Sequence, residues 1–150
     1  MASPSLQRGR ISCEGSYYVV TTVTAQRTRL FVDTANAQEV CYWLRTSDAQ
    51  GRTDSLTWVV MPDHIHWMFR LRDTPLSIVM RTFKSRSAKA LNQSNSTRGT
   101  VWQPGYYDQL QRDDRHLLAA ATYILANPLR AGLAKGMNDY PFAWCRWPLP

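Results

Sequence analysis

A run of eighteen mostly apolar residues, from Ser55 to Arg72, constrains the fold more than any other segment. It is too long for one ordinary strand, and the proline at its middle cannot donate to a central ladder. The sequence therefore predicts two strands, at about 55–61 and 64–71, joined by a tight turn at Pro62-Asp63. Side chains alternate between the faces of a strand. One face of the second strand carries His64, His66, Met68 and Arg70, and the other, expected in the core, carries Ile65, Trp67, Phe69 and Leu71.

The segments on either side alternate between strand and helix patterns. β-Branched and aromatic residues predict a strand over 16–25, and apolar residues spaced by three and four predict a helix over 34–45. A second helix is expected to run from Thr74, its candidate N-cap, to about Leu91. A turn at Pro104-Gly105 then precedes a further strand that ends near residue 112.

The last helix is expected to begin after a cap at Asp113 or Asp114 and to end at Asn127, because Pro128 cannot continue it. The resulting order of elements is strand, helix, strand, strand, helix, strand, helix. It predicts an α+β fold of ferredoxin-like or RRM-like type, with helices packed on an antiparallel sheet. We expect one domain over residues 1–150, with a short aromatic C-terminal tail from about residue 135 that is no long helix.

Composition limits the class of protein. Hydrophobic residues make up 44% of the 150 residues, which excludes a mainly disordered chain. No stretch reaches 18 consecutive apolar residues, so no membrane span is predicted. The net charge is +7, and 15 of the 18 basic residues are arginine. This excess favours nucleic acid or another polyanion as partner, although a GC-rich genome would also enrich arginine. Cys13, Cys41 and Cys145 form no metal-binding pattern and indicate reduced thiols in a cytoplasmic protein.

The pair His64 and His66 is the first candidate for chemistry. Two histidines at positions i and i+2 of a strand point to the same side, which is a spacing that suits two ligands of one metal ion. The alternative is a polar pair on the surface, opposite the buried Ile65 and Trp67.

The helix expected over 114–127 carries the second candidate. At about 100° per residue, its apolar stripe consists of Leu117, Leu118, Ala121, Ile124 and Leu125. Tyr123 lies opposite that stripe, and Asn127 follows one turn later on the same face. Tyr123 is either a side chain on a second, shallower contact face or a nucleophile aimed, together with Asn127, at the site of the histidines.

Basic and aromatic side chains form a third group. The helix that starts near Thr74 projects four basic side chains outward, either as a solvated face or as contacts for the phosphates of DNA: Arg81, Lys84, Arg86 and Lys89. Aromatic residues beside arginines, as in the segment Trp102 to Arg112 and in the tail, suit stacking on single-stranded nucleic acid. Core packing explains Trp102 and Tyr106 equally well.

Three segments, in order, resemble one known family. The segment VVMPDHIHWMF is similar to the VVMPNHVHLL signature of the single-tyrosine transposases, within the His-hydrophobic-His endonuclease superfamily. The stretch WQPGYYDQLQRDDRHLLAAATYILANPLRAGLA resembles a later block of that family, and YYVVTTVTAQRTRLF resembles its first strand. The resemblance covers about residues 16–134 and is greatest to the subgroup associated with repetitive extragenic palindromes (REP).

The resemblance implies roles for individual residues. His64 and His66 would bind a divalent metal, Asn127 would be its third ligand, and Tyr123 would be the nucleophile that forms a 5′-phosphotyrosine intermediate. The family fold is a central antiparallel sheet with helices, and either Mg²⁺ or Mn²⁺ would serve, although two imidazoles suit Mn²⁺ better. Asp63 departs from the family pattern, which has asparagine there, and adds a negative charge beside the metal site.

The partner implied is single-stranded or hairpin DNA, cut and rejoined at or near palindromes. We expect the following side chains to contact that DNA: Arg81, Lys84, Arg86, Lys89, Arg112 and Arg130. The resemblance leaves the oligomeric state open: transposases of mobile elements work as dimers, which makes a homodimer one possibility, and a monomer would indicate a host-adapted role. Two other functions stay open: a domesticated protein that binds palindromic DNA or RNA without cutting, and a metallohydrolase that uses water and leaves Tyr123 idle.

Overall fold

The protein is described by a computed structural model that covers residues 12–111 and 114–147. Five strands form the sheet: β1 (Tyr17–Val23), β2 (Thr53–Met61), β3 (His64–Leu71), β4 (Tyr107–Gln111) and β5 (Ala143–Cys145). The α-helices are α2 (Thr34–Ala49), α3 (Leu76–Asn95), α4 (Leu117–Leu125) and α5 (Asn127–Arg130). Short 3₁₀ turns are η1 (Ala25–Arg27), η2 (Leu30–Val32) and η3 (Asp114–His116).

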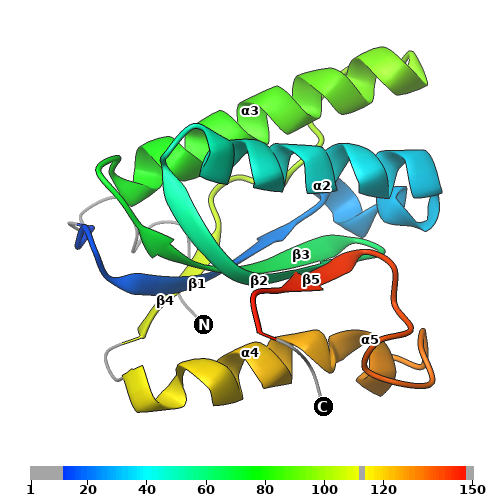
Figure 1. Ribbon diagram of the computed structural model, residues 1–150. Helices are drawn as coiled ribbons and strands as arrows, with labels where there is room; N and C mark the ends of the chain where they lie inside the picture. The colour runs from blue at the N-terminus through cyan, green and yellow to red at the C-terminus, as the bar shows by residue number, and fades with distance from the viewer. Residues whose placement is uncertain (1–11, 112–113, 148–150) are drawn as a thin grey trace.

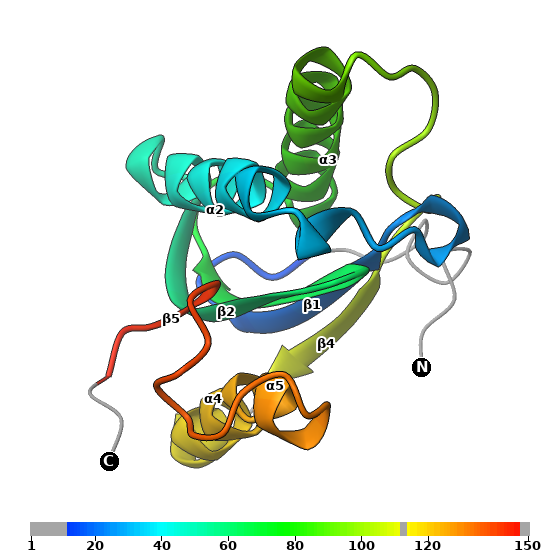
Figure 2. The same cartoon turned by 90° about the vertical axis from the view of Figure 1, so that its right-hand side faces the viewer.

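The strands lie in the order β4-β1-β3-β2-β5, and each neighbouring pair is antiparallel. Helices α2 and α3 cover one face of this sheet, and α4 and α5 cover the other (Figures 1 and 2). This arrangement confirms the predicted α+β fold with an antiparallel sheet. The sequence analysis predicted no regular structure in the C-terminal tail, but residues 143–145 form a fifth strand at the edge of the sheet, beside β2.

The hairpin of β2 and β3 forms as the sequence predicts. Met61 pairs with His64 across the turn at Pro62-Asp63, and the ladder runs back to the pair Thr53 and Leu71. Strand β2 begins two residues earlier than expected and contains a register shift between Ser55 and Thr57. The side of β3 that carries Trp67 faces α2 and α3, where the larger core lies.

The other face of the sheet has a smaller core of its own. It packs Val59 of β2 and Met68 of β3 against Ala121 and Ile124 of α4. Because His66 pairs with Val59 in the ladder, its side chain lies on this second face. The two histidines of β3 and helix α4 therefore belong to the same side of the molecule.

The helices differ from the sequence prediction mainly at their ends. Helix α2 continues to Ala49, and α3 continues to Asn95. Thr74 does not cap α3: Pro75 is the N-cap, and the first N–H of the helix, that of Leu76, donates instead to Ser12 Oγ at 3.2 Å. Because Pro75 has an extended backbone, at φ −57° and ψ 147°, the helix starts one residue later than expected.

The last helix is divided. After η3 it runs as α4, pauses at Ala126 and resumes as α5. Asp113 lies outside the described residues, and the side chain of Asp114 is likewise not described, so neither predicted cap is tested. Of the predicted apolar stripe, Ala121, Ile124 and Leu125 are buried, whereas Leu118 is exposed. Trp102 is buried, as the core-packing alternative required.

In the described part of the chain, the structure contains no helix with the length and apolar character needed to cross a membrane.

Replacing Trp67 by alanine tests the alternation of β3. Trp67 is fully buried, packs against Phe69 and Phe83, and donates from Nε1 to Ser55 Oγ at 2.8 Å. We expect Trp67→Ala to lower the free energy of unfolding by about 3–5 kcal/mol in urea titrations. The control Tyr42→Ala, on the exposed side of α2, should change it by no more than about 0.5 kcal/mol. Equal losses in the two variants would contradict this assignment of faces.

Candidate active site

His64 and His66 lie side by side at the start of β3. Their ring centroids are 4.9 Å apart, and the ring planes are nearly perpendicular, at 82°. Each ring is held through Nδ1: His66 by Thr21 Oγ1 at 2.9 Å, and His64 by Asp63 Oδ1 at 2.7 Å. Within the described residues, neither Nε2 atom has a hydrogen-bond partner. Both Nε2 atoms therefore remain available as ligands.

The partner of His64 Nδ1 matters because it selects the tautomer, whereas the hydroxyl of Thr21 can either donate to or accept from His66 Nδ1. A carboxylate only accepts, so Asp63 requires the proton of neutral His64 to be on Nδ1 and leaves the lone pair on Nε2. Burial, with smaller contributions from the charges of His64 and Arg130, lowers the pKa of His66 to about 4. His66 is therefore neutral at pH 7, the form in which imidazole binds a metal.

Asp63 is itself held by Arg27, whose Nη1 lies 3.2 Å from Asp63 Oδ2. Burial alone would raise the pKa of Asp63, but the hydrogen bonds and charges of His64 and Arg27 outweigh it and lower that pKa. Arg27 is presented by an unusual backbone, since Gln26 and Arg27 both have positive φ, at 58° and 51°. Thr24 fastens this segment, because its Oγ1 donates to the carbonyls of Thr28 and Asp63.

Asn127 lies at the break between α4 and α5. Pro128 has no N–H, so the carbonyl of Ile124 loses the donor that a continuous helix would supply. The side chain of Asn127 replaces it, with Nδ2 donating to Ile124 O at 2.8 Å. This bond turns the amide so that its oxygen Oδ1 is the atom left to accept or to coordinate.

Tyr123 lies on the outer side of α4 and is 66% exposed. In the described part of the chain, its hydroxyl has no hydrogen-bond partner, and its ring touches neither histidine. Arg130 of α5 lies over the ring, with its guanidinium carbon 4.0 Å from the ring centroid. The predicted nucleophile thus shares the histidines' side of the sheet, although it does not contact them.

The donor atoms fit a divalent metal. Two neighbouring imidazoles on one strand, with ring centroids 4.9 Å apart, each have Nδ1 held by a hydrogen bond, as is common in metal-binding histidines. Among the described residues, no three His, Cys, Asp or Glu side chains form a cluster for a metal. The amide oxygen Oδ1 of Asn127 is a potential donor atom outside these four residue types.

The predicted DNA-binding residues are not all on this side. Arg81, Arg86 and Lys89 are exposed on α3, in the opposite layer from α4. Arg86 donates from Nη1 to Gln50 Oε1 at 3.2 Å, which leaves other donors of its guanidinium for a ligand. Arg130 is exposed beside Tyr123, and Arg112 lies outside the described residues.

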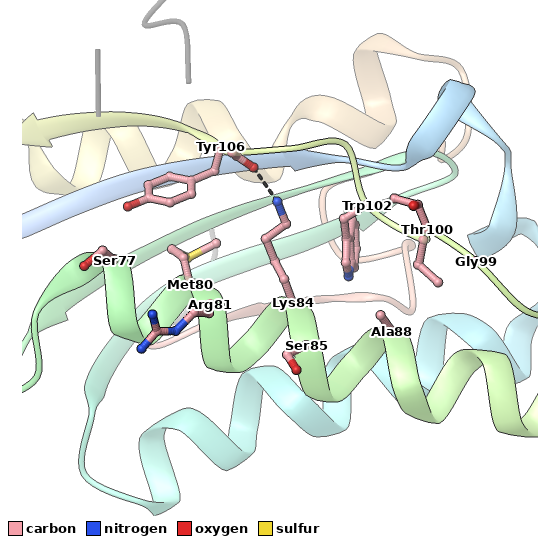
Figure 3. A pocket seen from close by; sticks show the side chains of 12 residues that line it. Ser77, Met80, Arg81, Lys84, Ser85, Ala88, Gly99, Thr100, Trp102 and Tyr106 are labelled. Carbon is pink, nitrogen blue, oxygen red and sulfur yellow. Dashed lines mark hydrogen bonds between the residues drawn. The ribbon is translucent and has the colours of Figure 1, made fainter. Parts of the chain in front are cut away.

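Lys84 corrects the prediction of an outward side chain. Its ammonium reaches from α3 to the segment before β4 and donates to Gln103 O at 2.6 Å and Gly105 O at 2.5 Å. Figure 3 shows the second of these hydrogen bonds. Burial lowers the pKa of Lys84 to about 8. The side chain borders a cavity of about 440 Å³ whose rim includes Arg81. Sequence reasoning missed this because helical periodicity cannot show that a later loop returns over the same face.

Two further residues of the site were missed, Thr21 and Arg27. Thr21 pairs directly with His66 in the ladder of β1 and β3, which explains their hydrogen bond. The only signal for Thr21 in the sequence was the alternation of side chains in the strand predicted over 16–25. That alternation identifies a neighbour of His66 only once the pairing of the strands is known. Arg27 depends on a left-handed turn that has no glycine to reveal it.

Among known protein families, residues 12–127 match the model of the IS200-like transposases. The chain belongs to this family. An 88-residue stretch is 30% identical to the REP-associated tyrosine transposase of Escherichia coli K12 and covers 57% of this chain and 50% of that protein. The match to this relative thus spans about half of the relative's length.

A second relative and one solved structure extend the similarity. Over 142 residues, the chain is 25% identical to a Haemophilus influenzae protein provisionally named as a REP-associated tyrosine transposase, covering 87% of this chain and 80% of the relative. The solved structure of a REP-associated tyrosine transposase bound to a REP hairpin has a TM-score of 0.74 at 23% identity, over 89% of this chain and 79% of that one. At this identity the likeness establishes the shared fold.

Two lysines of α3 provide a matched test of the buried tether, because Lys84 is partly buried and Lys89 is exposed. We expect Lys84→Ala to lower the free energy of unfolding by about 1–3 kcal/mol, because charged hydrogen bonds to two carbonyls are lost. Lys89→Ala should change it by less than about 0.5 kcal/mol. Urea unfolding followed by tryptophan fluorescence measures both. A smaller loss for Lys84→Ala than for Lys89→Ala would show that the tether to residues 103–105 is not formed in solution.

Proposed function

We propose that this transposase-family chain cuts and rejoins single-stranded DNA at or near hairpins, with Tyr123 as nucleophile. The observation that carries the proposal is the arrangement on one side of the sheet. Two histidines there leave Nε2 without a hydrogen-bond partner among the described residues, and the helix that packs on the same side carries an exposed tyrosine whose hydroxyl has none either. Tyrosines that pack into a protein usually find a hydrogen-bond partner, as the half-buried Tyr140 does by donating to Val60 O.

His64, His66 and Asn127 would hold a divalent ion, Mg²⁺ or Mn²⁺, and such an ion would withdraw charge from the oxygens of the scissile phosphate. Asp63 and Thr21 orient the two imidazoles for this task through Nδ1. Ile124 O orients the amide of Asn127. These roles belong to the proposal and agree with the free donor atoms described above.

The proposed reaction is a pair of transesterifications. Tyr123 Oη attacks phosphorus, the bond from phosphorus to the 3′ oxygen breaks, and the 5′ phosphate becomes attached to the tyrosine. The phenolic proton passes to solvent, which reaches this exposed hydroxyl. Attack by a second 3′-hydroxyl then breaks the phosphotyrosine bond, regenerates Tyr123 and reseals a strand. The bond energy is conserved, so no nucleotide cofactor is consumed.

Hairpin DNA is the proposed substrate, since the solved structure of the similar transposase is bound to a REP hairpin. A protein with a net charge of +7 attracts such a polyanion. The exposed Arg81, Arg86 and Lys89 lie in the layer opposite α4, so the proposal assigns them to the stem phosphates, away from the cut. We propose Arg112 as a further phosphate contact and a homodimer as the working assembly.

A denaturing gel tests the nucleophile. The protein is incubated with Mn²⁺ or Mg²⁺ and a single-stranded hairpin DNA labelled at its 3′ end, because the proposed adduct retains the 3′ part of the strand. We expect label that stays with the protein after boiling in detergent, that is abolished by chelation, and that is absent in Tyr123→Phe. Tyr42→Phe, an exposed tyrosine on α2, is the matched control and should form the adduct normally.

Other outcomes separate the alternative functions. A cut strand without adduct in the unmodified protein would identify water as the nucleophile. Binding of the hairpin without any cut would identify a domesticated binding protein. An adduct that persists in Tyr123→Phe would place the nucleophile elsewhere.

Substitution of Asp63 tests the metal site without DNA. We expect Asp63→Ala to weaken binding of Mn²⁺ about tenfold or more in calorimetric titration, because His64 loses the acceptor that fixes its tautomer. Asp63→Asn should weaken it less, since an amide oxygen can still accept from Nδ1. Unchanged affinity in Asp63→Ala would argue against His64 as a ligand.

A further inference from the structure

Arg130 contacts Tyr123 at two separate points. Its Nη2 donates to the backbone carbonyl of Tyr123 at 2.9 Å, and its guanidinium lies over the ring at 4.0 Å from the centroid. A planar guanidinium is able to do both at once, since its donors lie in the plane and its face stacks on aromatic rings. One side chain therefore holds the backbone and the ring of the same residue.

This double contact matters because the Tyr123 side chain has no hydrogen bond and no other ring contact among the described residues. Tyr123 is 66% exposed, and in the described part of the chain its hydroxyl has no partner. An exposed aromatic side chain ordinarily exchanges between rotamers on a scale of picoseconds to nanoseconds. A nucleophile that must approach phosphorus in line loses rate when it is spread over several orientations.

The position of Arg130 in the chain adds a second effect. Tyr123 belongs to α4, whereas Arg130 belongs to α5, beyond the break at Ala126. Helix α5 begins with Asn127, the proposed metal ligand. The contact across the break therefore fixes the proposed nucleophile relative to the helix that carries the proposed ligand.

We propose that Arg130 is a positioning residue, which holds the ring of Tyr123 in its attacking orientation, rather than a contact for the phosphates of DNA. This inference rests on the proposed role of Tyr123. It differs from the sequence-based expectation, which counted Arg130 among the DNA-binding residues. The two roles predict opposite effects on affinity and on rate.

The test compares Arg130→Lys and Arg130→Gln with the control Arg72→Gln in the full chain. Arg72 is an exposed arginine that pairs with Asp54, away from α4 and α5, and its loss removes the same charge. Two quantities are measured: the affinity for a 3′-labelled hairpin over a range of salt concentrations, and the single-turnover rate of adduct formation at saturating DNA.

For a positioning role, both Arg130 variants should form the adduct about tenfold to a hundredfold more slowly. The affinity should change less than threefold, and its salt dependence should stay that of the unmodified protein. Lysine should fail to rescue, because it retains the charge but not the planar stack. For a phosphate contact, affinity would fall, the slope of log affinity against log salt would shrink by about one in Arg130→Gln, and lysine would restore most of both; that result would overturn the proposal.

A second readout needs neither DNA nor metal and so survives failure of the proposed reaction. With 3-fluorotyrosine at position 123, the ¹⁹F spectrum of the free protein reports the surroundings and mobility of the ring. We expect a resonance displaced from that of the unfolded chain, which moves towards the unfolded value in both Arg130 variants and is unchanged in Arg72→Gln. Identical spectra for the unmodified protein and the Arg130 variants would show that Arg130 does not hold the ring, whatever the protein does to DNA.

Discussion

The turn at Pro62-Asp63 determines which side of the sheet each residue of β3 occupies. Met61 and His64 pair directly across it, so every later residue of β3 has a fixed face. A register shift of one residue would place Trp67 on the side of α4 and turn the histidines into the core beneath α2 and α3. Full burial of Trp67 therefore also keeps His64 and His66 on the side of α4, because the shifted register would move Trp67 out of the larger core.

The break at Pro128 is a second constraint of the same kind. A proline inside a helix costs a hydrogen bond, and the carbonyls left near it must be satisfied. Here two polar side chains do so, Asn127 at Ile124 O and Arg130 at Tyr123 O. Each of these bonds also sets the direction of a group with a proposed role, the amide oxygen of Asn127 and the ring of Tyr123. The two hydrogen bonds that satisfy the carbonyls at the helix break thus also orient the groups of the proposed site.

Sequence patterns predicted those features that depend on local periodicity. The hairpin, the three predicted helical segments and the common direction of the histidines follow from periodicity and from the positions of proline, whereas the division of the last helix into α4 and α5 was not predicted. Features that depend on distant segments were missed or misplaced. Lys84 has the spacing of an outward residue on α3, yet residues 103–105 return over it and take its ammonium. Leu118 has the spacing of a buried residue on α4, yet it is exposed.

The carboxylate of Asp63 shows how the surroundings alter the meaning of a single difference in sequence. Beside two histidines, an aspartate where the family has asparagine suggests extra negative charge at a metal site. In the structure that charge is shared, because Arg27 binds the other carboxylate oxygen. The arrangement requires left-handed backbone at Gln26 and Arg27, a conformation that is unfavourable for side-chain-bearing residues and persists only where its surroundings enforce it. An asparagine would accept from His64 but would offer Arg27 no charge, so the strained turn and the aspartate support each other.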